Sequence, residues 1–190
     1  PSFWTEPWSA GTDLESGQAQ NALFWRPIAQ ATYAFDWAIG GGKPWIFHLT
    51  NDLLNALCAG LVAWLAGLLW LQVTGSRAPT IGRFSWPALV AGVVFGVHAV
   101  HGDAVHLATY RTTLIAAAGV LGALVAHVRG GRFAALWLAA AYAFGLMGKE
   151  GAIVLPGLMV AVDIARPDVT WRSVWRRYAT ALAVAGVYLV

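Results

Sequence analysis

Charged side chains are scarce in this chain of 190 residues. They make up 11% of the sequence, whereas hydrophobic residues make up 58%. An ordinary soluble domain has about 25% charged residues, and with so few charges it would be unable to cover its surface. The high apolar content also excludes intrinsic disorder. The class that remains is all-α, a polytopic membrane helix bundle.

Cysteine and net charge are also low. The single cysteine, Cys58, excludes a disulfide framework and any multi-cysteine metal site. The formal net charge of +3 is too small and too scattered to indicate a nucleic-acid partner. No basic segment precedes an apolar core at the start, so no signal peptide is indicated. Because the chain begins at Pro1 and ends inside an apolar run at Val190, we expect an internal fragment of a longer protein.

Six apolar runs follow a more polar N-terminal segment. Residues 1–44 contain acidic residues, glycines and several tryptophans, and we predict an extracytoplasmic loop or interfacial segment there. Residues 45–190 are predicted to form a transmembrane helical bundle that is incomplete at both ends. Because a bilayer span needs about 20 apolar residues and several runs are shorter, we predict four to six transmembrane helices. The runs are 53–73, 86–100, 112–128, 133–148, 151–165 and 178–190.

The arginines predict an orientation in the membrane. Three connections that alternate along the chain carry eight of the twelve basic residues, and we predict that they share the cytoplasmic side. The opposite side, facing periplasm or lumen, then contains residues 1–44, the stretch 98–111 and the pair at 149–150. The arginines of the three connections are Arg77, Arg83, Arg129, Arg132, Arg166, Arg172, Arg176 and Arg177.

Several polar groups stand out on the predicted outer side, and each has a simple structural interpretation. Lys149 and Glu150 fit a topology anchor as well as a functional pair, although ionisable residues at membrane depth are functional candidates. Asp163 beside Arg166, on the other side, is predicted to be an end-of-helix pair. The outer groups are Arg26, then His48 with Asn51 and Asp52, then His98, His101, Asp103, His106 and Arg111, and then Lys149 with Glu150.

The histidine cluster leaves three alternatives open. On a helix, His98 and His101 share one face and Asp103 and His106 share another, so a single helix would not present all four to one ion. Ordinary hydrogen-bonding histidines are therefore favoured over a metal site. Ligation of a haem or a chlorophyll-type pigment is the third alternative, and the cofactor stays undetermined.

Three ordered motifs carry a resemblance to a known family. Arg26-Pro27, a glycine-rich break, Pro44 and the run 47–51 resemble an "RP…G…P…FHLxN" stretch. The segment 98–105 with Arg111 resembles "HPxHxEAV…R", and the segment 148–163 resembles "SKE…LP…D". This order resembles polytopic GT-C glycosyltransferases, especially the membrane half of the O-mannosyltransferase-like proteins that carry tetratricopeptide repeats.

The chain departs from the pattern of that family at several positions. Ala99 replaces a proline, Asp103 a glutamate, and Asn55 a common histidine, while Thr113 stands where an acidic residue is usual. The family's catalytic acidic motif lies before the "RP" stretch, and we expect it upstream of Pro1. The catalytic residues therefore stay unidentified.

The resemblance implies transfer of a sugar from a polyprenyl-phosphate lipid in the bilayer. A loop carboxylate acts as general base, and cations stabilise the leaving phosphate. The alternative is a non-catalytic transmembrane subunit whose partners are other membrane subunits. We predict that the 98–111 stretch and residues 149–150 converge near Arg26. The candidate substrate-binding residues are Arg26, His48, His98, His101, Asp103, Arg111, Lys149 and Glu150.

Overall fold

The fold is built from helices, as the composition predicts. The computed structural model describes residues 26–75, 80–81, 84–98, 107–167 and 169–189. The helices are α1 (Pro27–Gly40), α2 (Pro44–Thr74), α3 (Trp86–Val97), η3 (Ala108–Tyr110), α5 (Arg111–Arg129), α6 (Ala134–Gly148), η4 (Glu150–Val154), α7 (Leu155–Ile164) and α8 (Trp171–Leu189). A minimal antiparallel pair of strands, β1 (Thr80–Ile81) and β2 (Phe84–Ser85), precedes α3. The predicted all-α class is confirmed.

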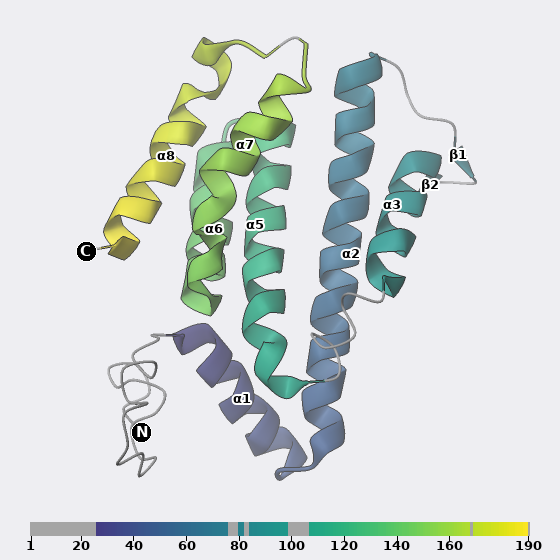
Figure 1. Ribbon diagram of the computed structural model, residues 1–190, viewed down its shortest axis with the longest axis vertical. Helices are drawn as coiled ribbons and strands as arrows, with labels where there is room; N and C mark the ends of the chain where they lie inside the picture. The colour runs from purple at the N-terminus through teal and green to yellow at the C-terminus, as the bar shows by residue number, and fades with distance from the viewer. Residues whose placement is uncertain (1–25, 76–79, 82–83, 99–106, 168, 190) are drawn as a thin grey trace.

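Proline and glycine punctuate the chain where the first two helices begin and end. Pro27 and Pro44 occupy the first positions of α1 and α2, where a missing backbone N–H costs nothing. Gly41 and Gly75 follow the two helices with φ of 58° and 65°. This left-handed conformation suits glycine and closes the last helical turn. The short turn at 41–43 therefore folds α1 back against the start of α2 (Figure 1).

Two helical segments are long and apolar enough to cross a membrane: α2, and the continuous segment Ala108–Arg129 formed by η3 and α5. The helix α2 has 31 residues and is about 46 Å long, so it exceeds a hydrocarbon core of about 30 Å. The shorter apolar helices α3 and α6 flank these two segments.

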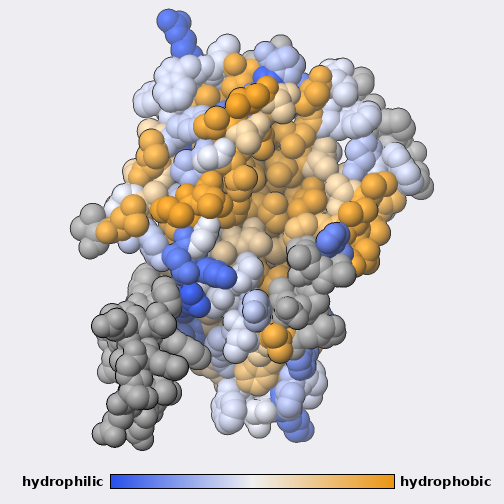
Figure 2. Space-filling view, viewed as in Figure 1, coloured by the Kyte–Doolittle hydropathy of each residue, from blue (hydrophilic) through white to orange (hydrophobic). Residues whose placement is uncertain are grey.

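The helix α5 lies at the centre of the bundle. Of the most apolar 18 residues in the segment Ala108–Arg129, 72% are buried, whereas only 6% of the corresponding residues of α2 are buried. The helix α5 packs between α2 and α6 (Figure 1). Apolar side chains cover much of the face shown in Figure 2. Large exposed side chains include Leu53, Leu57, Trp64, Leu136 and Trp137. A surface of this kind is suited to lipid rather than to water.

Two of the arginine-bearing connections, after α5 and after α7, meet at one end of the bundle (Figure 1), which we call the arginine end, whereas Arg77 and Arg83 lie outside the described residues. Gln72 near the end of α2 donates a hydrogen bond of 2.9 Å to the carbonyl of Val128 near the end of α5. His127 contacts Asp163 of α7 at 3.0 Å, and Arg177 of α8 donates to the carbonyl of His127. Asp163 also accepts a 2.7 Å bond from Arg166, as predicted for an end-of-helix pair. The assignment of this end to the cytoplasm stays a prediction.

Candidate functional site

The polar residues of interest gather at the opposite end of the bundle, which we call the site end. It is formed by α1, the start of α2, the junction of η3 with α5, and the start of η4 (Figure 1). These segments lie far apart in the sequence but are joined by hydrogen bonds and ion pairs. The predicted convergence on the region of Arg26 is confirmed for Arg111, Lys149 and Glu150.

Arg111 is the centre of a buried cluster that we call the Arg111 cluster. Its Nη2 lies 2.6 Å from Oδ2 of Asp36 in α1, and its Nε donates a 2.9 Å bond to Oδ1 of Asn51 in α2. Nη1 donates to Oγ1 of Thr32 at 3.2 Å, and Nη2 also donates to the carbonyl of Phe47 at 2.9 Å. The side chain of Arg111 has no exposed surface and that of Asp36 is 2% exposed.

The surroundings of the Arg111 cluster explain why a charge is tolerated there. Thr50 donates a 2.8 Å bond to Oδ1 of Asp36, and Oδ2 has the ion-pair contact with Arg111. The guanidinium also lies over the ring of Tyr33, 4.6 Å from the ring centre. A buried charge is tolerated when it is paired and its polar atoms are hydrogen-bonded. Arg111 therefore fastens α1 to the beginnings of α2 and α5.

Arg26 and Glu150 form an ion pair across the site end. The Nη2 of Arg26 lies 3.1 Å from a carboxylate oxygen of Glu150, and the two side chains are 25% and 46% exposed. Burial acts to raise the pKa of Glu150, but a backbone hydrogen bond and the charges of Arg26 and Lys149 outweigh it and hold this pKa below its ordinary value. The carboxylate is thus ionised at neutral pH, next to two cations.

Lys149 contributes a further cation to the site end. Its Nζ donates a 3.1 Å hydrogen bond to the hydroxyl of Thr113, in the first turn of α5. Within the described ranges, its ammonium group makes no ion pair with a carboxylate. In the described structure the charge of Lys149 is therefore only hydrogen-bonded.

The histidines contribute less to the described site. His48 is exposed on the second turn of α2, and His98 is exposed at the end of α3. His101 and Asp103, like His106, lie outside the described residues. In the part of the chain that the structure describes, no group of three or more potential metal-ligating side chains occurs.

Sequence reasoning did not single out Asp36, Thr32 or Tyr33 as partners of Arg111. A signal was present, because residues 32 and 36 are one turn apart and share a helix face. An aspartate inside an otherwise apolar segment is itself unusual. However, the sequence predicts the segment 27–40 only as part of an interfacial region, and this prediction assigns no partner to Asp36.

Acid should abolish the contribution of the Arg26–Glu150 pair to stability. Since the pKa of Glu150 is lowered on folding, the contribution is present above the unfolded-state pKa of about 4.3 and is lost as pH falls through the lower, folded-state pKa. We expect Glu150→Gln to lower the thermal unfolding temperature in detergent at neutral pH. The difference from the unsubstituted protein should vanish in strong acid, and a difference that does not change with pH would contradict this.

The chain is a helical membrane protein. Its helices expose large apolar side chains along the bundle, and its polar groups are joined by hydrogen bonds and ion pairs at the site end. Among known proteins it is similar to the protein O-mannosyl-transferase Tmtc2 of Drosophila melanogaster, with 31% identity over 87% of this chain. It is 25% identical to Tmtc3 of the same organism over 85% of this chain, and 30% identical to human TMTC2 over 54%. The resemblance inferred from the three motifs is confirmed.

The similarity covers only part of each relative. The matched region amounts to 17% of Drosophila Tmtc2 and 19% of Tmtc3, so the chain spans less than a fifth of their length. No family profile matches the chain, and no solved structure matches it significantly.

Proposed function

We propose that this chain is part of a membrane glycosyltransferase that takes a sugar from a polyprenyl-phosphate donor at the site end. The names of the relatives support transfer of mannose to protein. One observation about the site supports it most directly: Lys149 has no carboxylate partner in the described ranges and lies beside Glu150, which holds Arg26. Two cations so placed suit a phosphate leaving group.

The geometry favours different roles for the three cations. Lys149 would bind the donor phosphate directly, because its ammonium has only a hydroxyl partner. Arg26 would assist it, since its side chain is 25% exposed and its partner Glu150 is near the surface. Arg111 is a positioning residue in this proposal: its guanidinium is fully buried and already bonded to Asp36, Asn51 and Thr32.

The proposed reaction is a displacement at the sugar's first carbon. The acceptor hydroxyl oxygen forms the new bond to that carbon while the bond from the carbon to the lipid-phosphate oxygen breaks. The hydroxyl proton passes to a carboxylate acting as general base, which the resemblance places upstream of Pro1. The electron pair stays on the phosphate, and Lys149 offsets the charge that develops there.

The proposal includes an arrangement in the membrane. The arginine end faces the cytoplasm, because basic connections are enriched on that side, and the site end then faces periplasm or lumen. Residues 1–44 lie at the outer surface and residues 45–190 within a GT-C bundle of four to six transmembrane helices. In this arrangement the shorter apolar helices α3 and α6 lie in the bilayer beside α2 and α5.

Replacing Lys149 by alanine should reduce sugar transfer by the full-length protein about tenfold to a hundredfold. A hydrogen bond between charged groups contributes about 1.5–3 kcal/mol, and each 1.4 kcal/mol is a factor of about ten in rate. The assay measures transfer from a polyprenyl-phosphate-linked mannose to a protein acceptor. Arg172→Ala, which removes an exposed arginine at the start of α8, is the matched control and should leave transfer unchanged.

Normal turnover by the Lys149→Ala protein would contradict the role of this residue. Absence of transfer by the unsubstituted full-length protein, together with stoichiometric copurification with other membrane subunits, would favour the non-catalytic alternative. Arg111→Lys gives a further test, because a positioning residue should affect thermal stability and transfer together.

A further inference from the structure

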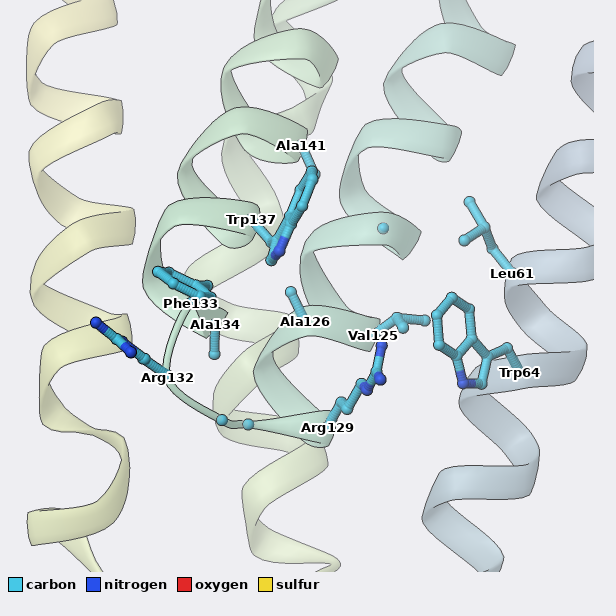
Figure 3. A pocket seen from close by; sticks show the side chains of 13 residues that line it. Leu61, Trp64, Val125, Ala126, Arg129, Arg132, Phe133, Ala134, Trp137 and Ala141 are labelled. Carbon is cyan, nitrogen blue, oxygen red and sulfur yellow. The ribbon is translucent and has the colours of Figure 1, made fainter.

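A groove of about 620 Å³ opens at the arginine end, between α2, α5 and α6. Figure 3 shows Trp64 of α2 and Trp137 of α6 on opposite sides of it, with Val125 and Ala126 of α5 between them. Apolar side chains form its walls, and its floor is the small-residue face of α5. This groove lies at the other end of the bundle from Lys149 and does not belong to the proposed transferase site.

Two arginines lie at the rim of this apolar groove. Arg129 ends α5 and lies over the Trp64 ring, 5.6 Å from its centre, while Arg132 lies over Phe133 at 5.1 Å. Both arginines are exposed. No acidic side chain lines the groove, and none of the ion pairs found within the described ranges includes either arginine. The rim therefore carries two positive charges with no acidic partner in the described structure.

The turn between α5 and α6 holds these arginines at the rim. Gly130 and Gly131 have φ of 67° and 97°, a conformation that side chains larger than glycine's rarely adopt. The N–H of Gly130 donates to the carbonyl of Ala126 at 3.1 Å and closes the last turn of α5. The chain thus reverses between α5 and α6 and leaves both arginines at the arginine end. In Figure 3 Arg129 lies beside Trp64 at the opening, whereas Arg132 points away from it.

We infer that this groove binds an anionic phospholipid of the surrounding bilayer. The phosphate is held at the rim by Arg129, and an acyl chain lies along the apolar wall toward Ala141. Arginine pairs phosphate oxygens through several hydrogen bonds at once. Exposed tryptophans such as Trp64 and Trp137 are typical of the level of lipid headgroups. Basic pockets between membrane helices bind such headgroups in the same manner.

Charge complementarity favours a lipid over a protein helix in the groove. The apolar face of a transmembrane helix would fill the walls but would leave both guanidinium groups without an anion. Unpaired charges near the hydrocarbon region are costly. An anionic phospholipid supplies the apolar chain and the charge in one molecule, in the same relative positions as the walls and the rim.

Native mass spectrometry of the full-length protein in detergent tests this inference. The probes are phosphatidylglycerol, which is anionic, and phosphatidylcholine, which has no net charge. We expect preferential retention of phosphatidylglycerol and at least a tenfold loss of that preference in the double variant Arg129→Gln, Arg132→Gln. The control variant Arg172→Gln, Arg176→Gln removes two exposed arginines of α8 and should retain the preference. Equal retention by the two variants would overturn the inference.

Two further experiments identify the molecule that occupies the groove. A photo-crosslinking amino acid in place of Trp137 should give a lipid adduct in membranes, whereas a crosslink to another segment of the protein would overturn the inference. Glycerol 3-phosphate, which carries the anion without the chain, should not displace phosphatidylglycerol at millimolar concentration. Displacement of phosphatidylglycerol by glycerol 3-phosphate would show that the groove binds phosphate alone, and this result would also overturn the inference. Circular dichroism establishes that each variant is folded.

Discussion

Replacing Arg111 by alanine is expected to lower the free energy of unfolding by about 3–5 kcal/mol. The substitution leaves Asp36 buried without its cation, with its side chain only 2% exposed. It also removes the donors to Asn51 and Thr32. Because these partners belong to α1 and α2, the loss should loosen the contacts of both helices with the start of α5.

Thermal unfolding of the full-length protein in detergent, followed by circular dichroism, measures this effect. The control Arg172→Ala removes an exposed arginine and should change stability by no more than about 0.5 kcal/mol. The double variant Asp36→Leu, Arg111→Met should recover much of the loss, because an apolar pair of similar size leaves no buried charge. An Arg111→Ala protein as stable as the control would contradict the structural role of this cluster.

A methyl group at Gly119 should separate α5 from α6. A Cβ atom there would lie 2.4 Å from Cα of Gly145 and 2.7 Å from the carbonyl oxygen of Ala141. Both are backbone atoms, so no side chain can rotate away, and the two helices themselves must move. Close packing between membrane helices depends on small residues at such crossings. We expect Gly119→Ala to destabilise the protein by about 3 kcal/mol, the upper part of the usual range for overpacking.

The matched control for this prediction is Gly60→Ala in α2. A Cβ atom at Gly60 meets no heavy atom within 4 Å, so its substitution should be neutral or slightly stabilising, as expected when alanine replaces glycine in a helix. The same unfolding measurement compares the two variants. If the Gly119→Ala protein has the same unfolding temperature as the Gly60→Ala protein, this result would contradict the close packing of α5 against α6 at Gly119.

The helices of this protein were largely predictable from the sequence. The predicted run 112–128 matches α5 (Arg111–Arg129) and the run 133–148 matches α6 (Ala134–Gly148) within one or two residues. Helix position depends on local features, chiefly continuous apolar stretches bounded by glycine, proline and charge. The same local features placed the arginines in alternate connections. Of these, the connections after α5 and after α7 lie at one end of the bundle (Figure 1), whereas Arg77 and Arg83 lie outside the described residues. Of the polar candidates, Arg26, Arg111, Lys149 and Glu150 lie at the opposite end, whereas His101 and Asp103 lie outside the described residues.

The tertiary structure alone decided which polar groups pair. Arg26 pairs with Glu150, which lies 124 positions away in the sequence. Arg111 pairs with Asp36 inside the bundle, so its guanidinium does not line a space that a ligand could enter. Lys149 takes a hydroxyl partner on α5, and the groove at Arg129 exists only because α2 and α6 stand apart over α5. Apolar patterning fixes each helix along the chain, but it does not fix the rotation and approach of one helix against another. Those depend on close contacts such as that of Gly119 with Gly145, and they determine whether a cation is buried in the bundle or available to bind a phosphate.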